Sequence, residues 1–161
     1  MIKTIVLGGG CFWGLQELIR KQPGVVSTRV GYAGGSVDNP TYENHYGHAE
    51  VVEISYDTDA TELKNILDFF FRVHNPTTLN QQGNDRGSSY RSVIFYANED
   101  EREEAEKFIE LVNQSKRWPD PVVTTLESFT KFFEAEDYHQ DYLQKNPAGY
   151  TCHAVYFDTY L

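Results

Sequence analysis

Hydrophobic and polar residues along the chain change between a two-residue and a helical period, and these changes predict the secondary structure. A short apolar run over 4–7 predicts a buried strand that the following glycines end. Apolar residues then recur at helical spacing at Phe12, Leu15, Leu18 and Ile19. A Pro-Gly pair at 23–24 ends this helix, and 25–32 has the pattern of a second strand. The chain is therefore expected to begin as strand, helix, strand.

The same alternation continues to the carboxyl end. Further strands are predicted over 49–56, 92–96 and 122–126, and a short helix over 138–145. Two longer helices are predicted from the apolar stripes Leu63, Ile66, Leu67 and Phe70 and Ala105, Phe108, Ile109 and Val112. Strands that alternate with helices indicate one sheet with helices packed on it, in an α/β or α+β sandwich.

Two long polar segments, 33–47 and 77–90, interrupt this pattern. A compact domain usually keeps loops of such length for function, and loops often carry binding residues. We therefore expect the segment 33–47 to contribute to a site.

Size and charge limit the class of protein. The 161 residues, 40% hydrophobic and 14% aromatic, are enough for one soluble domain over 1–161. A net charge of −10 would repel a nucleic-acid backbone. No stretch has membrane-spanning length, so we expect no membrane partner and a cytoplasmic location. In that compartment the two cysteines do not indicate a structural disulfide.

Cys11 is the first candidate for chemistry, because it follows three glycines where a strand gives way to a helix. Backbone N–H groups and the positive end of the helix dipole are expected to lower its thiol pKa from about 8.5 toward neutrality. Glycine-rich turns also bind phosphates. However, Leu15-Gln16 replaces the Lys-Ser/Thr of a P-loop, and Trp13 stands where a dinucleotide motif needs glycine.

Glu50 is the second candidate, since the two-residue period of a strand places it on one face with Val52, Ile54 and Tyr56. Apolar neighbours would raise its pKa and allow it to donate a proton near neutral pH. The alternative is that Glu50, at the start of its strand, lies in solvent.

The remaining candidates are ordinary when taken singly. Phe12, Trp13, Tyr42, Asp85 and Tyr90 lie beside these groups or in the two loops, where packing or turn formation also explains them. His45 and His48 have no further ligands nearby and do not indicate a metal site. The other histidines, His74, His139 and His153, are expected to cap helices or lie at the surface.

Cys152 lies in a turn-rich tail that few elements are expected to hold, which suits a thiol that resolves an oxidised Cys11. That role requires the two Cα atoms to approach within about 7 Å. The alternative is an unrelated second cysteine.

Together these motifs resemble one family, methionine sulfoxide reductase A. The resemblance covers nearly the whole chain and rests on segments that occur in family order. They are Gly10-Cys11-Phe12-Trp13-Gly14, Gly31-Tyr32-Ala33-Gly34-Gly35, Asn39-Pro40-Thr41-Tyr42, Gly47-His48-Ala49-Glu50-Val51-Val52, His74-Asn75-Pro76-Thr77-Thr78-Leu79-Asn80, Gln82-Gly83-Asn84-Asp85-Arg86-Gly87 and Tyr90-Arg91-Ser92.

The resemblance implies an activity and a fold. The activity is reduction of methionine S-sulfoxide, free or in proteins, as repair of oxidative damage, with thioredoxin or another dithiol as reductant and no metal or other cofactor. The fold is a single-domain α+β two-layer sandwich with a split β-α-β, ferredoxin-like core. A coil-rich tail over 146–161 would carry the resolving cysteine.

The resemblance also implies the residue roles. Cys11 would be the nucleophile that becomes a sulfenic acid, Glu50 the acid, and Cys152 the resolving cysteine. Tyr42 and Tyr90 would donate to the sulfoxide oxygen, Asp85 would be a polar partner, and Phe12 and Trp13 would hold the substrate methyl group. The chain departs from many members in its short 43–46 segment, and from some members in having a single cysteine in the tail.

Two other functions fit the residues alone. A thiol peroxidase would use the same pair of cysteines on peroxides. A non-catalytic module would bind a thioether in a pocket formed by Phe12 and Trp13.

Overall fold

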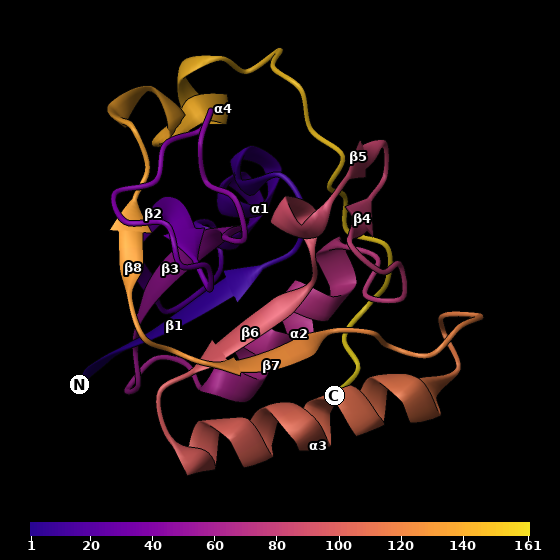
Figure 1. Ribbon diagram of the computed structural model, residues 1–161. Helices are drawn as coiled ribbons and strands as arrows, with labels where there is room; N and C mark the ends of the chain where they lie inside the picture. The colour runs from indigo at the N-terminus through magenta and orange to yellow at the C-terminus, as the bar shows by residue number, and fades with distance from the viewer.

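The computed structural model describes residues 1–161 and contains one six-stranded sheet with helices packed against it (Figure 1). Its strands are β1 (Ile2–Gly8), β2 (Val25–Ala33), β3 (Ala49–Asp57), β4 (Gln81–Gln82), β5 (Asp85–Arg86), β6 (Val93–Tyr96), β7 (Thr125–Ser128) and β8 (Phe132–Glu134). Its helices are α1 (Phe12–Ile19), α2 (Leu63–Val73), α3 (Glu99–Ser115) and α4 (Tyr142–Lys145), with 3₁₀ turns at Ser88–Tyr90 and Asp137–His139. No helix is both long enough and apolar enough to cross a bilayer.

The sheet has the strand order β7-β6-β1-β3-β2-β8, and β4 and β5 form a separate small hairpin. All neighbouring strands in the large sheet are antiparallel except β6 and β7, which are parallel. The prediction of an α+β fold built on one sheet is therefore confirmed.

The main core lies between the sheet and the helices α1, α2 and α3. The apolar stripe predicted for α2 is buried throughout, and Leu15 and Ile19 bury the inner face of α1. Burial of such stripes, more than intrinsic propensity, stabilises helices of this length. The core also encloses the inner face of β3, so a side chain on that face loses contact with water.

The carboxyl-terminal third differs from the prediction. Residues 122–124 lie outside β7, since the amides of Val122 and Val123 donate to Asn113 and Pro76. The helix predicted over 138–145 is divided into a 3₁₀ turn and α4, because Asp141 takes a left-handed conformation with φ 53°. Strand β8 was not predicted.

The tail over 146–161 is coil, yet it is firmly attached. Figure 1 shows it in yellow, running past β4 and β5 and alongside α2 toward α3. The Tyr156 amide donates to the carbonyl oxygen of Arg72 at 2.8 Å, and the amide of the buried Tyr160 donates to Asp68 at 2.6 Å. The expectation that few elements hold the tail is therefore wrong, since its backbone groups bond to α2.

Candidate active site

The turn between β1 and α1 places Cys11 at the N-cap of the helix. Gly10 makes this turn possible, because its φ of 93° lies in a region that favours glycine and its missing side chain makes room for Gln82. Cys11 itself is buried. Its sulfur thus lies under a tight backbone turn, at the edge of the core.

Glu50 reaches this turn from β3 and is 1% exposed. Its Oε1 accepts a hydrogen bond from the backbone N–H of Phe12 at 3.2 Å, while its Oε2 is buried without any partner. Burial raises the pKa of Glu50 to about 8, the Phe12 amide opposes the change, and the charge of Asp85 adds to it. The alternative in which Glu50 lies in solvent is wrong, and the prediction of a carboxyl group protonated at neutral pH is confirmed.

The thiol of Cys11 behaves differently from the prediction. Burial raises its pKa well above the ordinary value, and the charges of Glu50 and Asp85 raise it further. Only the backbone N–H of Trp13 acts to lower it. The expected lowering by the helix terminus is therefore wrong, because one backbone amide does not compensate for removing the thiolate from water. Cys11 is a neutral thiol at rest.

Tyr42 and Tyr90 converge on the same place from the two long loops. Burial raises the pKa of both hydroxyls, and Glu50 and Cys11 raise it further where these two groups are ionised. Both phenols therefore remain protonated and can donate hydrogen bonds. The Tyr42 backbone is fixed by Glu136, which accepts from its amide at 3.1 Å and from the Tyr32 hydroxyl at 2.9 Å.

Aromatic side chains form a wall beside Cys11. Trp13 stacks on Tyr142 with ring centroids 3.7 Å apart, and its indole Nε1 donates to Nδ1 of His139 at 2.9 Å. The His139 ring also contacts Phe12 and Tyr42, at centroid distances of 5.1 and 4.7 Å. Sequence reasoning missed Tyr142 and His139, for which the only signal was their place in the helical segment after the motif residues.

His74, His139 and His153 are all buried, so the surface alternative is wrong for all three. The capping alternative is confirmed for His74, which is the C-cap residue of α2. Each has a specific partner. Nδ1 of His74 lies 2.6 Å from the Phe70 carbonyl oxygen and its Nε2 lies 2.7 Å from the Ser92 hydroxyl, and burial lowers the pKa of His74 to about 3.

His45 and His48 form hydrogen bonds within the loops. Nδ1 of His48 accepts from the Gly35 amide at 3.0 Å, and Nε2 of His45 lies 2.7 Å from the Ser89 hydroxyl. No cluster of three His, Cys, Asp or Glu side chains has the arrangement of a metal site.

Cys152 is brought beside this site by the tail, and both cysteines are free thiols. Its sulfur lies 3.7 Å from Oδ2 of Asp85, which also accepts from the Tyr150 hydroxyl at 3.0 Å. Burial and the charge of Asp85 raise the pKa of Cys152, while the Tyr150 hydroxyl and the backbone N–H of Cys11 act in the opposite direction. Because the backbone N–H of Cys11 acts on the sulfur of Cys152, the two cysteines are neighbours in the fold.

The tail packs so closely on α1 that Gly14 has no room for a side chain. A Cβ there would lie 2.5 Å from Nδ1 of His153 and would also overlap the Thr151 hydroxyl. Gly14→Ala is expected to destabilise the protein by about 1–3 kcal/mol, measured by urea unfolding. Helix propensity alone predicts a gain of about 0.5–1 kcal/mol, so a stabilised variant would contradict this packing.

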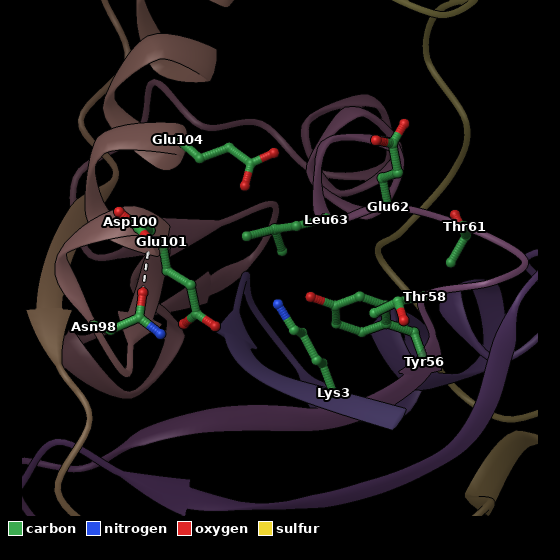
Figure 2. A pocket seen from close by; sticks show the side chains of 10 residues that line it. All are labelled: Lys3, Tyr56, Thr58, Thr61, Glu62, Leu63, Asn98, Asp100, Glu101 and Glu104. Carbon is green, nitrogen blue, oxygen red and sulfur yellow. Dashed lines mark hydrogen bonds between the residues drawn. The ribbon is translucent and has the colours of Figure 1, made fainter. Parts of the chain in front are cut away.

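An acidic hollow elsewhere on the molecule has none of these features. Figure 2 shows its lining, in which the Tyr56 hydroxyl and Lys3 face Glu101 and Glu104. It contains no cysteine and none of the candidate residues. The chemistry is therefore assigned to the surroundings of Cys11.

Comparison with known proteins identifies the family of the chain. Residues 3–159 match the family model described as peptide methionine sulfoxide reductase. The chain belongs to this reductase family. A relative named peptide methionine sulfoxide reductase MsrA, from Mycolicibacterium gilvum, is 59% identical over 151 residues, which cover 94% of this chain and 89% of the relative.

Solved structures from the same reductase family share the fold. The reduced form of Mxr1 from Saccharomyces cerevisiae is 37% identical with a TM-score of 0.90, covering 97% of this chain and 93% of that one. Mxr1 in complex with Trx2 is 27% identical with a TM-score of 0.68, covering 97% and 91% of the two chains. Hydrogen-bond and electrostatic contacts link Cys11, Tyr42, Glu50, Asp85, Tyr90 and Cys152, and Phe12 and Trp13 follow Cys11 at the start of α1.

Proposed function

We propose that the protein reduces methionine sulfoxide to methionine, with Cys11 as the nucleophile and Glu50 as the acid. The observation that carries this proposal is the unpartnered Oε2 of Glu50, buried beside the Cys11 turn. A buried oxygen without a hydrogen bond is costly, and it is retained where it serves a reaction. A protonated carboxyl at this position can donate to a polar substrate oxygen.

The surrounding groups fit a methyl sulfoxide. Phe12 and Trp13 offer an apolar wall for the methyl group, and the Tyr42 and Tyr90 hydroxyls can donate to the sulfoxide oxygen. Donors fixed in a dry site stabilise developing charge better than water does, because they need no reorganisation. One wall for the methyl group and one set of donors for the oxygen select a single epimer at sulfur, which we assign as the S form.

The first step transfers oxygen from the substrate to Cys11. The Cys11 sulfur attacks the sulfoxide sulfur, the oxygen takes a proton from Glu50, and the thiol proton returns to the carboxylate. The O–H group then moves from the substrate sulfur to the Cys11 sulfur as the bond between the two sulfurs breaks. Methionine leaves and Cys11 remains as a sulfenic acid, so the substrate sulfur is reduced and the Cys11 sulfur is oxidised. A neutral thiol at rest fits this sequence, since the thiolate is needed only once the substrate is bound.

The second step uses Cys152, which condenses with the sulfenic acid to release water and form a disulfide. A dithiol protein of the thioredoxin type then opens this bond by exchange. The Mxr1 structure with Trx2 supports such a partner, and neither step requires a metal or other cofactor. Asp85 stays a polar partner of the tail through Tyr150 and Cys152.

The same proposal includes the finer organisation of the chain. Strand β3 lies between β1 and β2, which supports a split β-α-β, ferredoxin-like core in a two-layer sandwich. We assign residues 1–161 to one domain, with 146–161 as the tail that carries Cys152. Free cysteines fit the reducing cytoplasm, where methionine sulfoxide in free form and in oxidised proteins would be the substrates.

Reaction with one equivalent of methionine sulfoxide, without reductant, tests the proposal. We expect one methionine per chain and a Cys11–Cys152 disulfide, detected by mass spectrometry of the digested protein. Cys11→Ser serves as the control and should yield no methionine. Binding without thiol oxidation would contradict the proposal, and so would faster oxidation by hydrogen peroxide than by methionine sulfoxide.

A further inference from the structure

His153, the residue after Cys152, lies at the centre of the contact between the tail and the catalytic turn. It is 7% exposed, and its Nε2 lies 2.6 Å from the carbonyl oxygen of Gly9. Its Nδ1 lies 3.8 Å from the sulfur of Cys152. One imidazole ring therefore joins the glycine turn before Cys11 to the thiol that must attack Cys11.

The partner of Nε2 fixes the form of this ring. A carbonyl oxygen only accepts hydrogen bonds, so Nε2 of His153 carries the hydrogen. Burial lowers the pKa of His153, while the carbonyl oxygen of Gly9 and the charge of Asp85 oppose this change. The ring is therefore neutral at neutral pH. Nδ1 therefore has a free lone pair, directed toward the region of the Cys152 sulfur.

Cys152 needs a proton acceptor to react. Only a thiolate attacks a sulfenic acid rapidly, and burial keeps Cys152 in the thiol form. Asp85 also lies near this sulfur, but its Oδ2 already accepts from the Tyr150 hydroxyl. A carboxylate is in addition an ordinarily weaker base than an imidazole. His153 is the better acceptor of the two.

We propose that His153 is the general base of the resolving step, taking the proton of Cys152 through Nδ1 while Nε2 stays bound to Gly9. This inference rests on the proposed function, because it concerns the second half of that reaction. The Gly9 carbonyl acts as the group that orients the base and compensates the positive charge it gains.

The resolving step conserves protons and electrons. The thiol proton of Cys152 moves to Nδ1, its sulfur bonds to the sulfur of Cys11, and the S–O bond of the sulfenic acid breaks. The departing hydroxide takes the proton back from the imidazolium and leaves as water. Cys152 is oxidised, the Cys11 sulfenic acid is reduced, and His153 returns to its neutral form.

Several groups bear on the titration of this ring. Asp85 faces it from β5, Cys152 from the tail and His74 from the end of α2, and Cys11 lies on the turn beneath it. The negative Asp85 favours the imidazolium, which assists proton uptake. His74, neutral in its buried place, adds no competing charge.

The test measures disulfide formation after one equivalent of methionine sulfoxide, by rapid quench and mass spectrometry between pH 5.5 and 9. His153→Gln keeps a donor for the Gly9 carbonyl but has no basic nitrogen. Its disulfide formation is expected to be ~10- to 100-fold slower at pH 7, within the range that general bases provide. The variant's rate should rise about tenfold per pH unit, because only thiolate formed by ionisation reacts. The wild-type rate should stay nearly level in the neutral range.

Two controls separate proton transfer from packing. Thr151→Val removes the hydroxyl that accepts from the His153 amide, so it loosens the tail but leaves the imidazole in place. It should keep the level pH profile of the wild type. The yield of methionine in the first turnover reports on the proposed function separately, because methionine leaves before the resolving step begins.

The inference would be overturned by a wild-type profile that rises tenfold per pH unit, or by equal rates and profiles in wild type and His153→Gln. If the glutamine variant does not fold, the wild-type profile alone still decides, since it needs no variant. A slow Thr151→Val with the same profile as His153→Gln would assign the effect to packing and overturn it too.

Discussion

Replacing Glu50 by glutamine is expected to lower the rate of methionine formation in a single turnover by ~100-fold at pH 7, within the range that general acids provide. The amide preserves the shape and the hydrogen bond from the Phe12 amide, but it has no acidic proton for the sulfoxide oxygen. The wild-type rate should also fall as pH rises above about 8, where Glu50 ionises, and the variant should lack this fall. Unchanged turnover would remove Glu50 from the mechanism.

The stability of Glu50→Gln provides the control. The folded chain holds a proton on Glu50 up to pH of about 8, whereas the unfolded chain loses it near the ordinary pKa of about 4.3. The contribution of Glu50 to the free energy of unfolding is therefore fully present only below pH of about 4.3. It is lost as the pH rises from there to about 8. At pH 7 the glutamine variant is expected to melt at the same temperature or higher, so a lower rate cannot be attributed to unfolding.

Local patterns were sufficient to predict the first half of the fold. The α2 stripe and the strands β1, β2 and β3 follow from periodicity, because each element buries one face against the same core. The division of 138–145 was not predictable in this way, since it depends on the left-handed Asp141 and on packing of His139 against Trp13. Tertiary contacts decide such short elements.

The pKa values in the site were likewise predictable only where they follow from the local sequence. The raised pKa of Glu50 followed from alternation along one strand, which is a local property. The pKa of Cys11 was predicted in the wrong direction, because the helix terminus is visible in the sequence and the burial of the sulfur is not. The place of Cys152 likewise depended on the packing of Thr151 and His153 against Gly14, which joins distant parts of the chain.

Cys152→Ser is expected to have the larger effect on complete turnover. With thioredoxin as reductant, steady-state turnover should fall by ~1000-fold, a loss typical of removing a required nucleophile. Serine cannot form a disulfide, so the reductant has no bond to open by exchange and would have to attack the buried Cys11 sulfenic acid directly. Coupled assays that follow oxidation of the reductant measure this rate.

The first turnover of the same variant should remain close to that of the wild type. Cys152 touches Asp85 and His153, but the donors proposed for the sulfoxide, Glu50, Tyr42 and Tyr90, do not depend on its sulfur. One methionine per chain should therefore form, with Cys11 left as a sulfenic acid that a dimedone probe labels. Rapid thioredoxin-dependent turnover in the variant would show that the reductant reaches Cys11 directly. The closely packed tail would then have to move away from Cys11 during each cycle. In that case the attachment of the tail to α2 would not be needed for the resolving step.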